Sequence, residues 1–391
     1  MEPKVIFNHH LKNVKPSVVG KFLEIANEYK EIISLSVGEP DFQTPWHIRQ
    51  AGIEALEQGK TFYSPVRGLF ALRQEISEYM HKRFDVLYQP KTEILVTVGS
   101  SEAIEMAYRT LLNPGDEVLI VQPSYLVYEP MVYMAGAVPI IIETFEKDGF
   151  RLKPEQLREK ITSKTRLLIL PYPCNPTGAI MEKEDLEAIA EVIRETDMLV
   201  LSDEIYAELN YSDISHVSIA SIEGMRQRTI VTSGFSKAFA MTGWRIGYAC
   251  APEEIISAMT KYHQYAIMCA PTVSQFAAIE ALKNGASDIL TMRNEYNMRR
   301  RYIVDRLLKM GLSCYEPKGA FYVFPNISST GLGSEDFCER LLKQKQVAVI
   351  PGNAFGQCGE GFIRISYSFS LKHIIEATNR MEEFIQELSQ G

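Results

Sequence analysis

Short apolar runs, rich in β-branched residues, alternate with longer amphipathic stretches over the first two thirds of the chain. The apolar runs predict seven strands, at residues 93–98, 117–121, 137–142, 166–170, 198–202, 229–232 and 245–249. Helices are expected between them, among others at residues 100–112 and 182–195. Because these strands are apolar on both faces and alternate with helices, the pattern predicts an α/β fold: a mostly parallel seven-stranded sheet covered by helices on both sides.

The pattern changes near residue 284. A long polar helix is expected at 288–308, followed by short strands at 320–324 and 362–366 and by helices at 334–343 and 371–388. An early helix, at 17–29, is expected to pack with this C-terminal part. We therefore predict a large domain at residues 46–283 and a small α+β domain built from both chain ends, residues 1–45 and 284–391.

Composition narrows the class of protein. The chain has 391 residues, of which 46% are hydrophobic, and a formal net charge of −8, which excludes a disordered chain and disfavours nucleic acid as a partner. The polar start and the strand-sized apolar runs predict neither a signal peptide nor a membrane span. Six scattered cysteines without a CxxC pair indicate neither a zinc site nor a disulfide framework. We expect a cytoplasmic protein without a metal, membrane or nucleic-acid partner.

Residues able to carry chemistry directly follow three of the predicted strands. Asn175 follows the fourth strand, Asp203 and Tyr206 follow the fifth, and Lys237 follows the sixth. In an open parallel sheet, residues beyond the carboxyl ends of the strands face the ligand crevice. The sequence therefore predicts that an amide, a carboxylate, a phenol and an amine meet at one place.

The first predicted strand passes into its helix through Gly99, Ser100 and Ser101. Small residues let backbone N–H groups approach an anion there, and the helix dipole favours negative charge. Serine is also an ordinary N-cap residue, so this segment alone fits both a phosphate seat and a plain helix start.

Four motifs in this order carry a resemblance to a known family. They are NPTG at 175–178, SDEIY at 202–206, SKAFAMTGWRIGY at 236–248 and FIRIS at 362–366. Together they resemble the class I and II aminotransferases, pyridoxal-phosphate (PLP) enzymes of fold type I, the aspartate aminotransferase fold. The resemblance runs from about residue 33 to near the C-terminus. It is greatest to the bacterial and archaeal aromatic, aspartate and N-acetyl-diaminopimelate aminotransferases.

The resemblance implies a role for each residue at the strand ends. Lys237 would hold PLP covalently and later move the proton between the substrate α-carbon and the cofactor. Asp203 would accept a hydrogen bond from the pyridine nitrogen and keep it protonated. Tyr206 and Asn175 would hydrogen-bond the phenolate oxygen, and Arg245 would pair with the phosphate.

Further cofactor contacts follow from the same resemblance. They are Ser100, Ser101, Ser233 and Ser236 at the phosphate, Tyr125 stacked on the ring, and Tyr63 reaching the phosphate of a neighbouring subunit. Many relatives have a hydroxyl residue three positions before the lysine, where this chain has Gly234, so the choice between Ser233 and Ser236 stays open. The role of Tyr63 implies a homodimer with its active sites at the interface.

Substrate contacts are implied for Arg364, Gly38 and Asn175, with the guanidinium of Arg364 clamping the α-carboxylate of the amino acid. Gly38 would bind the same carboxylate through its backbone N–H. Because Arg364 belongs to the predicted small domain, substrate binding would draw that domain over the active site.

The function implied is a ping-pong transfer of the amino group of an L-amino acid to a 2-oxo acid, expected to be 2-oxoglutarate. Aromatic, aspartate, alanine and N-acyl-diaminopimelate donors stay open. Ser101 stands where some aspartate-preferring relatives have a lysine. A PLP-dependent carbon–sulfur β-lyase would use the same cofactor residues and is the alternative. A transcriptional regulator would need a helix-turn-helix domain, for which the residues before Val37 leave no room.

Overall fold

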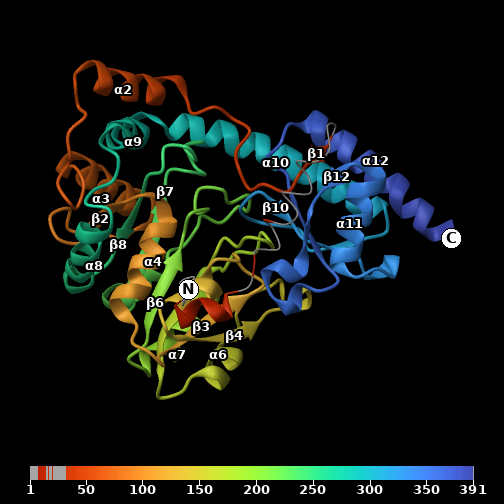
Figure 1. Cartoon of the computed structure of the whole chain (residues 1–391), viewed down its shortest axis with the longest axis horizontal. Coiled ribbons are helices and arrows are strands. Elements are labelled where there is room, and N and C mark those ends of the chain that lie inside the picture. The colour runs from red at the N-terminus through yellow and green to blue at the C-terminus, as the bar shows by residue number, and fades with distance from the viewer. Residues whose placement is uncertain (1–7, 15, 17–19, 21–31, 391) are drawn as a thin grey trace, which may run out of the picture.

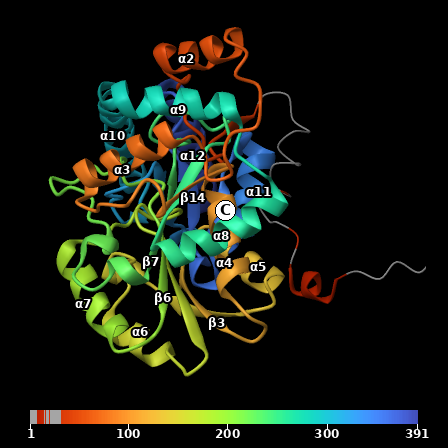
Figure 2. The same ribbon diagram turned by 90° about the vertical axis from the view of Figure 1, so that its left-hand side faces the viewer.

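The computed structural model describes residues 8–14, 16, 20 and 32–390 (Figure 1). Apart from Gly20, the helix predicted at 17–29 lies outside the described residues. The remaining elements fall into two groups, a large sheet with its helices and a set of C-terminal elements (Figures 1 and 2).

The large sheet contains the seven predicted strands, each within a few residues of its predicted bounds. They are β2 (Ile94–Thr97), β3 (Glu117–Gln122), β4 (Val138–Glu143), β5 (Thr165–Leu170), β6 (Leu199–Asp203), β7 (Thr229–Gly234) and β8 (Gly247–Cys250). Their order across the sheet is β2-β8-β7-β6-β5-β3-β4. Only β8 pairs antiparallel with its neighbours, so the carboxyl ends of the other six strands lie at one edge.

Helices cover both faces of this sheet. One face packs on α4 (Gly99–Leu111), α5 (Tyr128–Met134) and α8 (Glu253–Ala266). The other packs on α3 (Phe70–Phe84), α6 (Pro154–Lys160), α7 (Lys183–Arg194) and α9 (Thr272–Asn284), and α2 (Trp46–Glu57) lies on α9. Successive strand residues point to opposite faces: Val118 and Ile120 belong to the first layer, and Leu119 and Val121 to the second. This explains the continuous apolar runs, because both faces are buried.

The C-terminal elements begin with the long helix α10 (Ala286–Lys309), which runs away from the sheet (Figure 1). They continue with β9 (Ser313–Cys314), β10 (Tyr322–Val323), β11 (Pro325–Asn326), α11 (Ser334–Lys345), β12 (Val347–Ala348), β13 (Ile350–Pro351), β14 (Ile363–Ser366) and α12 (Leu371–Gln390). The early strand β1 (Ile33–Ser34) pairs with β12, which brings these two residues to this group. Antiparallel pairing in the order β10-β14-β13 fixes the position of Arg364.

Short 3₁₀ helices connect these elements, at His9–Asn13, Glu146–Asp148, Ile219–Ser221, Arg226–Arg228, Ser328–Thr330, Gly352–Phe355 and Gln357–Gly359. Among the described residues, no helix has the length and apolar character needed to cross a membrane. All six cysteines are unpaired.

Candidate active site

The carboxyl edge of the sheet and the C-terminal elements enclose a cavity of about 370 Å³. All but two of the site residues expected from the sequence line it: Gly38, Ser100, Ser101, Tyr125, Asn175, Asp203, Tyr206, Ser236, Lys237, Arg245 and Arg364. They come together because β2, β5, β6 and β7 all end at this edge and the residues after each strand turn over it. The other two, Tyr63 and Ser233, do not line the cavity.

Asp203, the last residue of β6, holds a deeply buried carboxylate. Its Oδ2 accepts a hydrogen bond from the Tyr128 hydroxyl at 2.7 Å, and its Oδ1 accepts from the backbone N–H of Ile205 at 3.4 Å. Burial raises the pKa of Asp203 to about 6, although these two hydrogen bonds favour the ionised form. A carboxylate in such surroundings is stabilised by any cationic N–H group that enters the cavity.

The turn after β7 places the amine of Lys237 in the same cavity, where Nζ donates to the carbonyl oxygen of Gly38 at 2.7 Å. Burial lowers the pKa of Lys237 to about 8. The guanidinium groups of Arg364 and Arg245 act in the same direction, and the carboxylate of Glu39 opposes them. Such an amine is partly neutral near physiological pH and can serve as a nucleophile or a base.

Arg364, on β14, carries a guanidinium that is 4% exposed. It donates to Asn175 Oδ1 at 3.0 Å and to the carbonyl oxygen of Ser36, and it lies over the rings of Tyr322 and Phe355 at 4.6 and 4.7 Å. Its Nε has no hydrogen-bond partner, and no carboxylate pairs with it among the described residues. Burial lowers the pKa of Arg364. An anionic ligand would satisfy both the charge and the free N–H.

The N-terminus of α4 forms an anion cradle with Arg245. Gly99 has φ +77°, which favours glycine, and a Cβ added there would lie 2.6 Å from Nη2 of Arg245 and displace the guanidinium. Nη1 of Arg245 donates to the carbonyl oxygen of Thr242 at 2.9 Å. The cradle therefore combines a helix N-terminus with a guanidinium, the arrangement that suits a phosphate.

Next to this cradle, Glu102 and His263 form a buried hydrogen-bonded pair. Glu102, in the first turn of α4, accepts a hydrogen bond from the backbone N–H of Val98 at 2.5 Å, and its other oxygen lies 2.7 Å from Nδ1 of His263. His263, on α8, is fully buried, and its Nε2 has no partner among the described residues. The pair links α8 to the turn between β2 and α4 and fixes the position of that turn.

The two serines near Lys237 differ in the direction of their hydroxyl groups. The Ser233 hydroxyl points away from the cavity and donates to the carbonyl oxygen of Glu204 at 3.3 Å, whereas Ser236 lines the cavity. A Cβ at Gly234 would lie 3.0 Å from the Cα of Gly247, so a side chain there would push the closely paired strands β7 and β8 apart by a few tenths of an ångström.

Tyr63 is 80% exposed and is not among the residues that line the cavity. Next to it, Phe62 is 81% exposed, and its carbonyl oxygen accepts from Thr272 Oγ1 at 2.7 Å, at the start of α9. Whatever Tyr63 contacts is therefore outside this chain's own cavity.

Two tyrosines of the site were not expected from the sequence. Tyr128 holds Asp203, and the Tyr322 hydroxyl lies 2.7 Å from that of Tyr206. Tyr322 also closes over Gly38, where an added Cβ would lie 1.8 Å from its hydroxyl oxygen. Both tyrosines lie within predicted elements or next to them, but nothing in their spacing marks them apart from ordinary core aromatics.

Comparisons with known proteins identify the family of this chain. The family model for class I and II aminotransferases matches residues 30–380. A putative aminotransferase of Bacillus subtilis is 48% identical, covering 97% of this chain and 98% of that protein. An aspartate aminotransferase of Pyrococcus abyssi is 46% identical, with 96% and 97% covered. The crystal structure of an aromatic aminotransferase from Pyrococcus horikoshii superimposes with a TM-score of 0.90 at 46% identity, covering 94% and 99% of the two chains.

Proposed function

The chain belongs to the class I and II aminotransferases, and its activity is PLP-dependent transfer of an amino group; from this premise we propose how its own residues perform the transfer. The main support for the proposal is that Lys237, Asp203 and Arg364 line the same cavity and that the pKa of the Lys237 amine is lowered to about 8. Neither the carboxylate nor the guanidinium has an ion-pair partner among the described residues.

The residues lining the cavity fit PLP. A protonated pyridine nitrogen would give the buried Asp203 its missing cationic partner, and the cradle of Gly99 and Arg245 suits the phosphate. Lys237 supplies the amine for a covalent link, and Tyr206 and Asn175 offer hydrogen bonds to the phenolate oxygen. When bound, PLP withdraws electrons from the substrate α-carbon and makes its proton removable.

Proton movement is assigned to Lys237. Its lowered pKa leaves part of the amine neutral, so that it can take a proton from the substrate α-carbon and return it on the cofactor side. Tyr206 is held by Tyr322, and Asp203 by Tyr128, so both side chains are in position before substrate arrives. Hydrogen bonds formed in advance spare the cost of ordering them during the reaction.

We assign the binding of the substrate carboxylate to Arg364. Its guanidinium would bind the α-carboxylate of an L-amino acid and of 2-oxoglutarate in turn, in a ping-pong sequence. The relatives include proteins named as aspartate and as aromatic aminotransferases, so we propose that the donor is an aromatic amino acid or aspartate. Ser101 lines the cavity and brings no cation for a distal carboxylate, which favours the aromatic donors.

We further propose that residues 46–283 form a large domain and that residues 1–45 and 284–391 form a small one that closes over the substrate. Arg364 supports this, because it bonds Ser36 within the proposed small domain and Asn175 within the large one. A carboxylate bound to this guanidinium would therefore hold the two parts together.

A homodimer and a cytoplasmic location complete the proposal. Phe62, Tyr63 and Tyr265 are 81%, 80% and 88% exposed, more than large aromatic side chains usually are on a monomer. A second copy of the chain would cover them and let Tyr63 reach the partner's phosphate. Six unpaired cysteines suit a reducing compartment.

The test is a panel of amino donors with 2-oxoglutarate, read by the 2-oxo acid that each donor yields. We expect PLP to give the purified protein an absorption band in the near-visible range, and phenylalanine, tyrosine or aspartate to yield its 2-oxo acid. The Lys237→Ala variant should lose both the band and the product. Normal turnover by this variant, or ammonia release without a 2-oxo acid acceptor, would contradict the proposal.

A further inference from the structure

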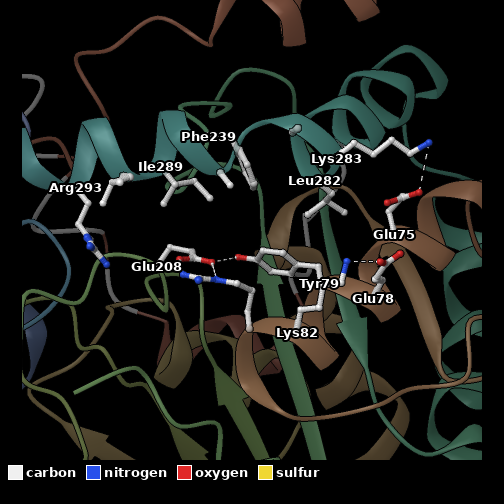
Figure 3. Close-up of a pocket in the computed structure, with 14 residues that line it drawn as sticks. Glu75, Glu78, Tyr79, Lys82, Glu208, Phe239, Leu282, Lys283, Ile289 and Arg293 are labelled. Atoms are coloured by element: carbon white, nitrogen blue, oxygen red, sulfur yellow. Dashed lines mark hydrogen bonds and ion pairs between the residues drawn. The ribbon is translucent and has the colours of Figure 1, made fainter. Parts of the chain in front are cut away.

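A second cavity, of about 620 Å³, lies where α3, α9 and α10 meet (Figure 3). It shares no lining residue with the catalytic cavity and is the larger of the two. It lies behind the catalytic turns, because two of its lining residues, Phe239 and Glu208, follow Lys237 and Tyr206 by two positions each. A cavity of this volume is in the range of small-molecule sites.

The floor of this cavity is apolar. Phe239, Ala281 and Ile289 are buried side chains of its lining, and Leu282 and Leu290 extend it toward solvent. Leu290 is 49% exposed, so the apolar lining continues to the surface. Covering this floor with an apolar group is favourable, by about 25 cal/mol per Å² of apolar surface removed from water.

The rim carries charges that are almost all paired. Lys82 pairs with Glu78, and Lys283 lies 3.5 Å from Glu75, as the dashed lines in Figure 3 mark. These acids therefore have partners already and leave no net negative charge at the rim.

The buried acid of the lining is compensated as well. Glu208 accepts from Arg83 through Nε at 2.9 Å and through Nη2 at 2.5 Å, and from the Tyr79 hydroxyl at 2.6 Å. This bidentate pair is the strong form of a carboxylate–guanidinium contact. Arg83 is thus engaged by its own carboxylate and is a poor receptor for a second one.

Arg293, on α10, is the exception. It is half-buried, and no hydrogen bond or ion pair joins it to any residue in the described part of the chain. Figure 3 shows its side chain extending from α10 down to the level of Glu208. It also lines an adjoining cavity of about 220 Å³ that shares Arg83 and Glu208 with the first, and Asp213 lines only that smaller one. The one uncompensated charge of the large cavity is therefore positive.

We propose that this cavity binds a small amphipathic monocarboxylate, with its carboxylate on Arg293 and its apolar body on the floor formed by Phe239, Ile289 and Leu290. One free guanidinium beside paired rim charges suits one negative charge. A purely ionic ligand such as inorganic phosphate would leave the apolar floor in water. The site stands apart from the proposed catalysis and does not depend on it.

The probe is 4-phenylbutyrate, which has a carboxylate and an apolar body but no amino or oxo group to react. Its binding to the PLP-loaded enzyme is measured by calorimetric titration. We expect Arg293→Gln to weaken binding at this site at least tenfold, as loss of a charge-assisted hydrogen bond does. Arg301→Gln is the matched control, because Arg301 lies exposed on the same helix and lines neither cavity; it should bind as the parent does.

Two arms separate this site from the catalytic one, where Arg364 also attracts carboxylates. Binding at the second site should persist in Arg364→Gln and be lost in Ala286→Trp, since Ala286 is exposed at the mouth of the cavity and its replacement fills it. The amide 4-phenylbutyramide should bind at least tenfold more weakly than the acid. The proposal is overturned if the parent shows no second site at up to about 10 mM probe, or if neither Arg293→Gln nor Ala286→Trp weakens it.

Discussion

The two cavities differ in whether their charged side chains have ion-pair partners. The smaller one, at the sheet edge, buries Asp203, Lys237 and Arg364, none of which has an ion pair among the described residues. The larger one keeps its acids paired, with Glu208 held by two groups and Glu75 and Glu78 by lysines at the rim.

Cavity volume therefore does not identify the active site of this protein. Burying an uncompensated charge costs several kcal/mol, so a fold keeps such charges only where a ligand supplies the missing partner. Charges that are paired within the chain already have their partner and need no ligand. By this criterion the catalytic cavity has three charged side chains that a ligand could pair with. The larger cavity has one, Arg293.

The largest expected difference between the two cavities is in the effect of replacing a lysine, Lys237 in the catalytic cavity or Lys283 at the rim of the larger one. Lys237→Ala should reduce turnover by about 10³-fold or more, because it removes the amine that moves the proton. Lys283→Ala, at the rim of the larger cavity and half exposed, should change turnover less than about twofold. Steady-state rates with 2-oxoglutarate measure both. Equal losses would mean that the catalytic amine has been assigned to the wrong cavity.

The two unpaired arginines come next. Arg364→Gln should lower kcat/KM for the amino donor by about 10²-fold, mainly through KM, since a buried bidentate contact with the carboxylate is lost. PLP should remain bound, as judged by its absorption. Arg293→Gln should leave kcat/KM within about twofold of the parent. Loss of PLP and substrate together in Arg364→Gln would show that this arginine serves the cofactor instead.

Stability should respond with opposite signs in the two cavities. Asp203→Asn removes a carboxylate whose burial penalises folding, so the cofactor-free variant should be more stable at pH 7 than the parent, by about 1–3 kcal/mol. The folded-state pKa of Asp203 is about 6 against an ordinary 3.8, so the native state binds a proton more tightly between these values. The contribution of Asp203 to parental stability therefore falls as pH rises from 3.8 to about 6, and the gain of the variant over the parent should grow over that interval.

Glu208→Gln provides the contrast, because it breaks the ion pair with Arg83 and should destabilise by about 1–3 kcal/mol. Urea unfolding of the cofactor-free proteins between pH 4.5 and 8 gives both values. The comparison of the cavities is wrong if Asp203→Asn destabilises at pH 7 as much as Glu208→Gln does.

The smallest effect concerns the support behind the phosphate cradle. His263→Ala should weaken PLP binding by about 1 kcal/mol, or roughly fivefold, because Glu102 loses the partner that fixes the turn at Val98. His47 is the matched control: it also lies 2.7 Å from a glutamate, Glu280, but on α2. Its alanine variant should bind PLP normally. Titration of the cofactor-free proteins with PLP measures the affinity of each variant. Equal affinities of the two variants would show that His263 does not support the phosphate cradle.

The strands of the sheet were predictable because each is apolar on both faces, and this pattern is visible in single runs such as residues 166–170. The order of the strands was not, since the insertion of β8 between β2 and β7 depends on long-range pairing. The motifs predicted Lys237, Asp203 and Arg364 because these residue types, at those strand ends, resemble a family. They did not predict Tyr128 or Tyr322, which act on the site through other side chains.

The seven strands, the residues at their ends and the family that those residues resemble can all be read from the amino-acid sequence, because local period and motif order are properties of the chain. Which hydroxyl faces the cavity depends on the folded chain, since Ser233 and Ser236 differ in direction and not in type. Only the structure separated paired from unpaired charges. A carboxylate such as Glu208 finds its arginine across 125 positions, and no local pattern encodes whether that partner arrives.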